Sequence, residues 1–521
     1  MAKVTVTING REVQVEEGLN LIEAARAHGI EIPHFCYHPG LGVDGNCRMC
    51  LIELEGVPKP QIACNTFAKD GLKFCTNSER VKEMQAAVLE FLFLNHPLDC
   101  PICDQSGECY LQDFYMSNGQ YDSRLDTPKQ HKRKVAPVGP RVTLDAERCV
   151  LCARCVRFCD DVTGTGELYI VNRGNRAEIT TYPDKPLDND YSVNTVDICP
   201  VGALTSNDFR FKKRVWFLHT SNSICTGCSR GCNTFIEQNE GVVYRLRPRE
   251  NMEVNRYWMC DPGRLTYKPL NEERLDVAML RGQMAPIHET LATLVQWLKE
   301  AGTGAAAART LVLVSPASPV ETLYAWKRFA ADVLGGASVM GAATRSPGIE
   351  DKLLRKSDPY ANRAGLEALG LKLDAEAALE AGGELLLIVD DDPIGQKPKW
   401  AELLKGWKRV AYFGSNENPS QRAAQVALPL APHSECEGTF VNFEGRVQRF
   451  EKAMIPQGDA LWAPALLSQV ARALGHEFGW NGLTDLWAEL AKGEPEFKGL
   501  DLEQIGTKGA LLPSRRPAQV G

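Results

Sequence analysis

The chain has 521 residues, a net charge of −7, and ordinary globular proportions of hydrophobic (44%) and charged (24%) residues. This length predicts about three or four domains, and the acidic balance argues against nucleic-acid binding, which usually needs a basic surface. No apolar run approaches the roughly 20 residues of a membrane-spanning helix, and the first residues carry no export signal. We therefore expect any membrane association to come through partner subunits.

Cysteine is concentrated in the first half of the chain. Of the 18 cysteines, all but three form, together with one histidine, four groups of four before residue 261. A chain of this size needs no disulfide staples, and the repeated C-x2-C spacing favours metal or cluster ligation in a reducing compartment. The pattern predicts four iron–sulfur clusters, as expected of a segment of an electron-transfer path.

The first group reads C-x10-C-x2-C-x13-C. It comprises Cys36, Cys47, Cys50 and Cys64. The preceding residues alternate like two short strands over 3–8 and 12–15, and residues 19–28 have helical spacing. This order, followed by a glycine-rich cysteine loop whose N–H groups turn toward the sulfurs, predicts a β-grasp ferredoxin with a [2Fe–2S] cluster. The alternative is a structural zinc site; we interpret the nearby His34 and His38 as structural.

The second group, H-x3-C-x2-C-x5-C, contains a histidine. It comprises His96, Cys100, Cys103 and Cys109. A predicted helix over 81–94 ends just before the histidine, and Pro97 stops it. A four-iron cluster needs a fourth ligand, and only three cysteines fall inside the motif. We predict His96 as that ligand, with Cys75 as the competitor. A neutral imidazole in place of a thiolate should raise the reduction potential of the cluster.

The third group is half of a two-cluster ferredoxin pattern. One run contains Cys149, Cys152, Cys155 and Cys159, and a later Cys-Pro pair supplies Cys199. In two-cluster ferredoxins the fourth cysteine of each run ligates the other cluster. The second run here retains only its Cys-Pro. We therefore predict that Cys199, rather than Cys159, completes a [4Fe–4S] cluster with the first three cysteines of the run.

The fourth group reads C-x2-C-x3-C-x27-C. It comprises Cys225, Cys228, Cys232 and Cys260. This spacing resembles the N-terminal [4Fe–4S] module of molybdopterin oxidoreductases such as formate dehydrogenase and nitrate reductase. Zinc is the alternative, because four cysteines alone do not choose the metal.

The sequence pattern of the second half of the chain predicts a doubly wound α/β domain. Buried strands end in polar loops within 311–318, 384–393 and 409–419, with helical stretches between them. Asp390–Asp392 are interpreted as a solvated loop. Cys436 is single and late in the chain, so no molybdenum ligand is placed. We expect no molybdopterin there, and a role in scaffolding and subunit contact.

The predicted organisation is a multidomain chain, α+β in its first part and α/β in its second. The domains are a β-grasp [2Fe–2S] ferredoxin over 1–79, a [4Fe–4S] module with one histidine and three cysteine ligands over 80–130, a ferredoxin-like [4Fe–4S] domain over 131–215, a molybdopterin-oxidoreductase-type [4Fe–4S] module over 216–271, an α/β domain without molybdenum over 272–507 and a tail over 508–521. Residues 302–309 are expected to form a turn or linker, and the tail is expected to be extended or disordered.

Taken together, the four groups resemble the large iron–sulfur subunit (the G subunit) of bacterial NADH–quinone oxidoreductase, respiratory complex I. The resemblance is carried by CYHPGLGVDGNCRMC, EFLFLNHPLDCPICDQSGECYLQD, RCVLCARCVRFCDDVTGTGEL, VDICPVGALTSNDFRFKKRVW and EGTFVNFEGRVQ. It implies one [2Fe–2S] and three [4Fe–4S] clusters, and a place on the cytoplasmic face of the inner (plasma) membrane, held peripherally by the complex. It also implies partners: a flavoprotein subunit that binds FMN and NADH, a two-cluster ferredoxin-like subunit and other peripheral-arm subunits.

The resemblance also implies an electron path. Electrons from NADH and FMN would enter at the Cys36 group, pass to the Cys149 group and then to the His96 group, and leave toward quinone. The fourth group would lie off this path. The resemblance implies neither an NADH nor a quinone site on this chain. Nothing in the sequence contradicts this, since no GxGxxG motif opens a βα unit near the cysteines. No residue is predicted as a general acid or base.

Three rival interpretations share parts of this pattern. An electron-transfer subunit of an NAD-linked hydrogenase has the first three groups, but such subunits are usually shorter. A formate dehydrogenase has the fourth group and the α/β domain, but it needs a longer body and a metal-ligating residue. A zinc-stapled scaffold would contain zinc and show no EPR signal.

Overall fold

The computed structural model describes residues 2–301 and 309–516. The chain divides into two compact units, Met1–Phe217 and Leu218–Gly521, which are described separately. The linker predicted over 302–309 lies, apart from Arg309, outside the described residues. In the part of the chain that is described, no helix is long and apolar enough to cross a bilayer.

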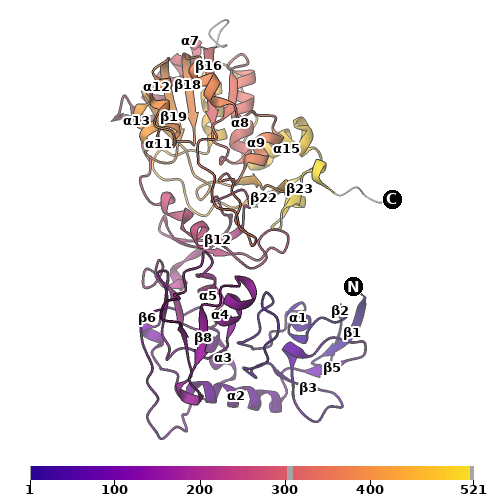
Figure 1. Ribbon diagram of the computed structural model, residues 1–521. Helices are drawn as coiled ribbons and strands as arrows, with labels where there is room; N and C mark the ends of the chain where they lie inside the picture. The colour runs from indigo at the N-terminus through magenta and orange to yellow at the C-terminus, as the bar shows by residue number, and fades with distance from the viewer. Residues whose placement is uncertain (1, 302–308, 517–521) are drawn as a thin grey trace. The chain divides into compact units, whose positions relative to one another are not determined.

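A five-stranded sheet forms the N-terminal part of the first unit (Figure 1). Its strand order is β2-β1-β5-β3-β4. The elements are β1 (Lys3–Ile8), β2 (Arg11–Glu16), α1 (Leu21–Arg26), β3 (Leu51–Leu54), β4 (Gln61–Ile62) and β5 (Lys73–Cys75). Alternate residues of β1 are apolar, so Val6 and Ile8 enter the core with Leu21 of α1. The predicted strand–strand–helix order of a β-grasp domain is confirmed.

Helix α2 (Glu79–Phe93) connects this domain to the second cysteine group. Its N-terminus is capped by Ser78, whose Oγ accepts a hydrogen bond from the N–H of Val81 at 3.2 Å. The helix buries Val81 and Leu89 and packs against α3 (Tyr110–Asn118). The helix predicted over 81–94 is thus present and begins two residues earlier, at the residue after its cap.

Small sheets hold the third cysteine group. The elements are β6 (Ala136–Pro137), β7 (Val142–Leu144), α4 (Arg154–Arg157), β8 (Leu168–Val171), β9 (Glu178–Thr181), α5 (Asn194–Asp197) and β10 (Leu204–Ser206). Strand β10 pairs antiparallel with β7, with Leu204 opposite Leu144. This pairing returns the chain after Cys199 to the strand that precedes Cys149.

The second unit begins with a three-stranded antiparallel sheet. Its elements are β11 (His219–Ile224), β12 (Asn233–Asn239) and β13 (Val242–Pro248), followed by the short helix α6 (Asp261–Arg264). The β11–β12 connection contains three cysteines of the fourth group. Cys260 immediately precedes α6, so the strand pairing and the helix start bring the four together.

A seven-stranded sheet with the order β15-β14-β20-β19-β18-β16-β17 forms the body of this unit. Its strands are β14 (Met279–Leu280), β15 (Gln283–Met284), β16 (Thr310–Val314), β17 (Ser338–Gly341), β18 (Gly383–Val389), β19 (Trp407–Gly414) and β20 (Val426–Pro429). The last five strands are mutually parallel, and β14 joins them antiparallel. The parallel part follows the doubly wound order 2-1-3-4-5, as predicted.

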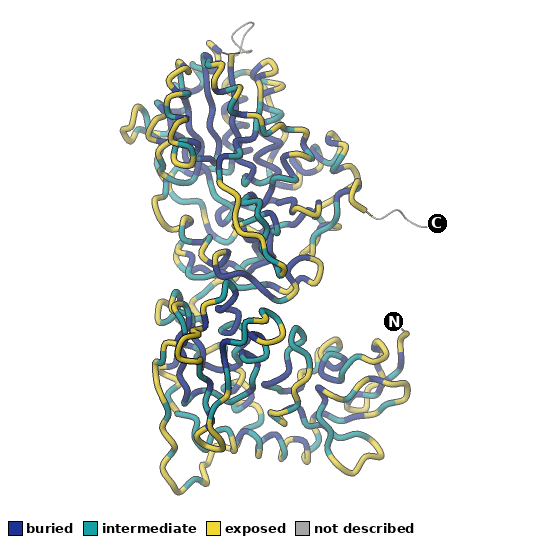
Figure 2. Tube along the Cα trace, in the orientation of Figure 1, coloured by how far each residue is buried: buried dark blue, intermediate teal, exposed yellow. Residues whose placement is uncertain are grey.

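Helices lie on both faces of this sheet (Figure 1), and its central strands are buried (Figure 2). The helices that follow α6 in this unit are α7 (Ile287–Ala301), α8 (Val320–Asp332), α9 (Arg363–Ala368), α10 (Ala375–Glu380), α11 (Pro393–Gln396), α12 (Trp400–Leu404), α13 (Pro419–Ala423), α14 (Ala463–Ala473), α15 (Leu483–Gly493) and α16 (Leu502–Ile505). Alternate residues of β16 enter opposite cores, Val312 with α8 and Leu313 with α12. The central strands are therefore apolar throughout.

The tail predicted to be extended or disordered is partly built into the fold. Strand β22 (Arg446–Phe450) pairs with β21 (Gly438–Val441) and with β23 (Ala510–Leu511) of the tail. Leu512 is buried beside this sheet. Residues 510–512 are extended, as expected, but they are not disordered, because an open edge of β22 supplies hydrogen-bond partners from a distant part of the sequence. Residues 517–521 lie outside the described part.

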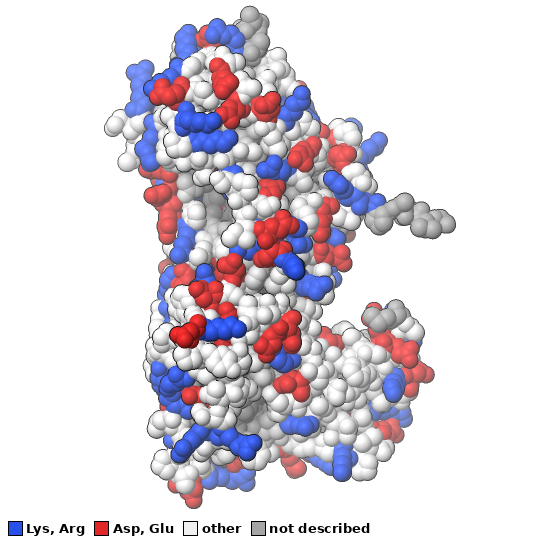
Figure 3. Space-filling model, in the orientation of Figure 1, with Lys and Arg blue, Asp and Glu red and all other residues white. Residues whose placement is uncertain are grey.

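Basic and acidic side chains are interspersed on the face drawn in Figure 3. No single-sign field extends over that face, which fits the slightly acidic net charge of −7. This distribution gives no support to nucleic-acid binding on the visible face.

Candidate metal centres

The four cysteines of the first group come together beside the β-grasp sheet. Cys36 and Cys64 flank the loop that carries Cys47 and Cys50, and all but Cys47 are buried. A hydrogen bond with the Cys47 side chain lowers the pKa of Cys36 to about 5. The side chains of Cys50 and Cys64 form a second hydrogen-bonded pair. This hydrogen bond has the largest effect on the pKa of each thiol, and a negative charge on Cys36 raises both pKa values.

Backbone N–H groups of the cysteine loop face a sulfur of the first group. The N–H groups of Gly45, Asn46 and Cys47 contribute to lowering the pKa of Cys36. Gly45 has φ +76°, a conformation that glycine adopts without strain. The predicted wrapping of the loop, with N–H groups turned toward a sulfur, is present.

The two histidines near this group make backbone contacts. His34 Nδ1 lies 2.7 Å from the carbonyl oxygen of Ile32, and the N–H of Gly40 donates to His38 Nδ1 at 3.1 Å. Burial lowers the pKa of His34 to about 4 and that of His38 to about 3. Both rings are therefore neutral at physiological pH, and each holds local backbone.

In the second group, His96 lines one cavity with Cys100 and Cys109. Burial raises the pKa of Cys109, and the charge of the nearby Cys103 raises it further. Burial lowers the pKa of His96 to about 4, so the imidazole is neutral and suited to metal ligation. The competing Cys75 does not line this cavity. Its Sγ donates to Asn77 Oδ1 at 3.4 Å, and the residue is half-buried.

In the third group, Cys149, Cys152, Cys155 and Cys199 line a single small cavity. Burial raises the pKa of Cys149 and of Cys152 to about 12, and it raises that of Cys155 further. The N–H of Leu151 donates to Cys149 Sγ at 3.4 Å. Cys159 is buried elsewhere, with the charge of Glu167 acting on it, and it does not line the cavity.

Hydrogen bonds tie the third group to the first and the second. Asn46, beside a cysteine of the first group, donates to the carbonyl of Leu151 in the third at 3.4 Å. The N–H of Tyr110, beside the last cysteine of the second group, donates to the carbonyl of Pro200 in the third at 3.0 Å. The third group therefore lies between the other two in the first unit.

Electrostatic interactions between the cysteines follow the same order. The charge of Cys36 raises the pKa of Cys152, and the charge of Cys199 raises the pKa of Cys109. Both pKa values are raised mainly by burial, and the charge effects are smaller. Because such effects fall with distance, the third group is a close neighbour of both the first and the second.

The fourth group is assembled in the second unit. Three of its cysteines are buried, and Cys228 is half-buried. The N–H of Gly227 donates to Cys225 Sγ at 3.4 Å. Burial raises the pKa of Cys225, and it raises that of Cys260 to about 11. A Cβ on Gly263 would stand 3.1 Å from both of these sulfurs, so glycine leaves the space between them open.

The donor sets fit clusters more readily than single ions. Within the described ranges, no three His, Cys, Asp or Glu side chains converge closely enough to hold one metal ion. In a [4Fe–4S] cluster each protein ligand binds a different iron atom, and in a [2Fe–2S] cluster two thiolates bind each iron. The four ligands of a cluster therefore stand further apart than the four ligands of one ion. Buried sulfurs, N–H donors to sulfur and glycine at close approach are the features that iron–sulfur sites use.

Buried arginines are the part of these sites that the sequence analysis did not predict. Arg148 donates to Asp99 at 2.6 and 3.1 Å, which places an ion pair between the second and third groups. Arg154 is 3% exposed and donates to the carbonyls of Tyr37 and Ile198. The available signal was the presence of basic residues within and beside the cysteine run.

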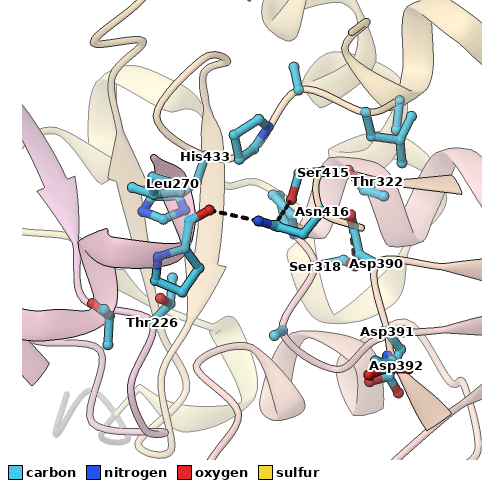
Figure 4. A pocket seen from close by; sticks show the side chains of 18 of the residues that line it. Thr226, Leu270, Ser318, Thr322, Asp390, Asp391, Asp392, Ser415, Asn416 and His433 are labelled. Atoms are coloured by element: carbon cyan, nitrogen blue, oxygen red, sulfur yellow. Dashed lines mark hydrogen bonds between the residues drawn. The ribbon is translucent and has the colours of Figure 1, made fainter. Parts of the chain in front are cut away.

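A cavity of about 440 Å³ lies at the carboxyl ends of the parallel strands in the second unit (Figure 4). Ser318 donates to Asp390 at 3.4 Å at its wall, and Thr344 hydrogen-bonds to Asp391. Burial raises the pKa of Asp390 and of Asp391 to about 7. The interpretation of 390–392 as a solvated loop was wrong for Asp391, which is 4% exposed, because Thr344 replaces water as its partner.

The β-grasp and ferredoxin-like folds with their grouped cysteines define an iron–sulfur protein. Four family descriptions match in chain order. They are "2Fe-2S iron-sulfur cluster binding domain" over 1–79, "NADH-ubiquinone oxidoreductase-G iron-sulfur binding region" over 85–124, "NADH-quinone oxidoreductase subunit 3, ferredoxin-like domain" over 139–205 and "Molybdopterin oxidoreductase" over 279–462. The chain thus has both 2Fe-2S and 4Fe-4S binding domains.

Relatives cover nearly the whole chain. The G subunit of the NADH-quinone oxidoreductase of Rickettsia felis is 30% identical over 96% of this chain and 92% of its own length. That of Streptomyces coelicolor is 33% identical over 99% of this chain, which spans 63% of the longer relative. A solved NAD+-reducing [NiFe]-hydrogenase in the H2-reduced state is 31% identical over 41% of this chain and 92% of its own, with a TM-score of 0.37. The chain belongs to the family of NADH-quinone oxidoreductase G subunits.

Proposed function

We propose that this chain is the electron-transfer subunit of an NADH–quinone oxidoreductase. In this role it carries electrons from NADH and FMN toward quinone, and the whole complex couples the transfer to proton translocation. The observation that supports this role is the placement of the third cysteine group between the first and the second, joined by hydrogen bonds at 3.4 and 3.0 Å. That order is the one the path requires.

The proposed ligands are the four groups in full. The [2Fe–2S] ligands are Cys36, Cys47, Cys50 and Cys64; the [4Fe–4S] ligands are His96, Cys100, Cys103 and Cys109, then Cys149, Cys152, Cys155 and Cys199, and then Cys225, Cys228, Cys232 and Cys260. When bound, the clusters supply one-electron carriers. The chain holds them apart from water and sets their surroundings, and no side chain acts as a general acid or base.

We propose no molybdopterin in the second unit. The cavity at the carboxyl ends of the strands is lined by Asp390, Asp391 and Asp392, with Arg345 as the one guanidinium that the described residues place in its wall. Three carboxyl groups suit a phosphate-bearing cofactor poorly, because any negative charge that they carry repels the phosphate. Among the residues that the structure describes, no cysteine lines the cavity as a ligand for the metal. This domain then serves scaffolding and subunit contact.

The proposed partners are the flavoprotein subunit that binds FMN and NADH, the two-cluster ferredoxin-like subunit and other peripheral-arm subunits. Through them the chain is held peripherally at the cytoplasmic face of the membrane. Neither NADH nor quinone is proposed to bind to this chain itself.

Removing the middle cluster tests the path directly. In the intact complex, Cys199→Ser should leave NADH-driven reduction of the [2Fe–2S] centre unchanged. It should slow reduction of the His96 centre at least about tenfold, because the intervening carrier is gone. Rapid-freeze EPR after mixing with NADH measures both centres.

Cys159→Ser is the matched control, since this thiol is buried nearby but lies outside the cavity. It should keep wild-type kinetics at both centres, with the iron content unchanged. Wild-type reduction of the His96 centre in Cys199→Ser, in protein shown to lack the middle cluster, would contradict the proposed path.

A further inference from the structure

Arg154 is a buried cation between two proposed redox centres. It lies in α4, between Cys152 and Cys155, and only 3% of the residue is exposed. Burying a charge is costly unless a counter-charge or hydrogen bonds compensate it. A role for this side chain must therefore explain what compensates its charge.

The hydrogen bonds of Arg154 reach the backbone beside ligands of two different groups. Its guanidinium donates to the carbonyl of Tyr37, the residue after Cys36, and to the carbonyl of Ile198, the residue before Cys199, the latter at 3.1 Å. These bonds fix the guanidinium between the first and third groups. The Arg154 guanidinium carbon also lies 5.8 Å from the centroid of the Tyr110 ring, beside the second group.

No described carboxylate forms an ion pair with Arg154. Burial lowers the pKa of the Arg154 guanidinium, whereas the deprotonated forms of Cys152, Tyr110, Cys199 and Cys36 would raise it. Arg148, the other buried arginine here, differs because Asp99 lies 2.6 Å from it and Asp145 lies 3.4 Å away. The counter-charge of Arg154 must therefore come from the cysteine groups on either side.

We propose that Arg154 is a positioning and tuning residue that raises the reduction potentials of the clusters held by the first and third groups together. A fixed positive charge beside a cluster favours the reduced form, which carries one more negative charge. Because one side chain lies beside both centres, it shifts both reduction potentials in the same direction. This inference rests on the proposed electron-transfer function.

Two substitutions in the full chain separate the effect of the Arg154 charge on the reduction potentials from the effect of its packing. Arg154→Gln keeps hydrogen-bond donors but removes the charge, whereas Arg154→Lys keeps the charge and loses the forked guanidinium. EPR-monitored redox titration of the anaerobically purified chain gives a midpoint potential for each centre. Arg176→Gln is the control, because it removes the same charge at an exposed position in the same unit.

We expect Arg154→Gln to lower the equilibrium constant for reduction of both centres about tenfold, which is about 59 mV for a one-electron couple. Arg154→Lys should stay within about threefold of the wild type, and Arg176→Gln should change nothing. If Arg154→Gln fails to assemble its clusters, wild-type reduction potentials in Arg154→Lys would still support a role for the positive charge at this position.

Other outcomes would overturn the inference. These are unchanged potentials in Arg154→Gln, a shift confined to one centre, an equal shift in Arg154→Lys, or loss of clusters in both variants, which would assign Arg154 a packing role alone. These failures are distinct from failure of the proposed function, in which the wild-type chain itself would lack the iron–sulfur signals.

Discussion

Single residues beside the cysteines decide whether the sulfurs have room. Gly202 follows Cys199 by three positions, and a Cβ added to it would stand 2.3 Å from Cys103 Sγ of the second group. Its φ is not in the left-handed region, so alanine is acceptable to the backbone and only the sulfur contact is tested. One glycine thus couples the packing of two cysteine groups.

Gly202→Ala should displace Cys103 and cost the chain the cluster of the second group, about four iron atoms. Iron analysis with EPR of the reduced chain measures this loss. Gly479→Ala, where an added Cβ meets nothing within 4 Å, should keep the full iron content. The prediction would be contradicted if Gly202→Ala kept the wild-type iron content and the EPR signal of the His96 centre, because the alanine Cβ would then fit beside Cys103 without loss of the cluster.

The proposed ligands are predictions from the sequence, whereas the buried arginines were not predicted. Cysteine spacing is local, and a C-x2-C pair specifies its chemistry within a few residues. The contact between Arg154 and Tyr37 joins residues 117 positions apart, and the sequence carries no sign of it. The burial of Asp391 was missed for the same reason, because its partner Thr344 is 47 positions away.

At the scale of elements, strand and helix patterns were predicted well where they are long and periodic. The helix over 81–94 and the strands within 384–393 and 409–419 are present with boundaries shifted by a few residues. The two-residue strand β23 was missed. Its existence depends on an open edge of β22 rather than on any pattern of its own.

Helix α8 begins with a buried carboxyl group that should make the second unit sensitive to pH. Glu321 is fully buried and accepts hydrogen bonds from the N–H and Oγ1 of Thr439 at 2.8 and 2.9 Å. Burial raises the pKa of Glu321 to about 7 from its ordinary 4.5. The folded state therefore holds this proton to higher pH than the unfolded state, and the free energy of unfolding falls as pH rises from about 4.5 through 7.

The increase in the free energy of unfolding caused by Glu321→Gln should accordingly be larger at pH 8 than at pH 5.5, and the difference between the two pH values should be about 2 kcal/mol. Urea unfolding followed by tryptophan fluorescence reports this unit, since Trp216 is the one tryptophan that precedes residue 218. Glu417→Gln, at an exposed position of the same unit, is the control. An effect of Glu321→Gln that is equal at the two pH values would contradict a raised pKa.

At the scale of the whole molecule, the cysteine groups divide between the two units. Three lie in Met1–Phe217 and one in Leu218–Gly521. The three groups of the first unit are tied to one another by backbone and arginine hydrogen bonds. This division matches the proposal that three clusters form the path and that the fourth stands apart from it.

The metal content of the anaerobically purified chain tests the four proposed clusters most directly. Iron, zinc and acid-labile sulfide are measured, with EPR of the reduced sample. Four clusters require about fourteen iron atoms per chain, two for the first group and four for each of the others, with one [2Fe–2S] signal and several [4Fe–4S] signals. About ten iron atoms would remove one four-iron site from the assignment, whereas about four zinc ions without an EPR signal would contradict the electron-transfer function altogether.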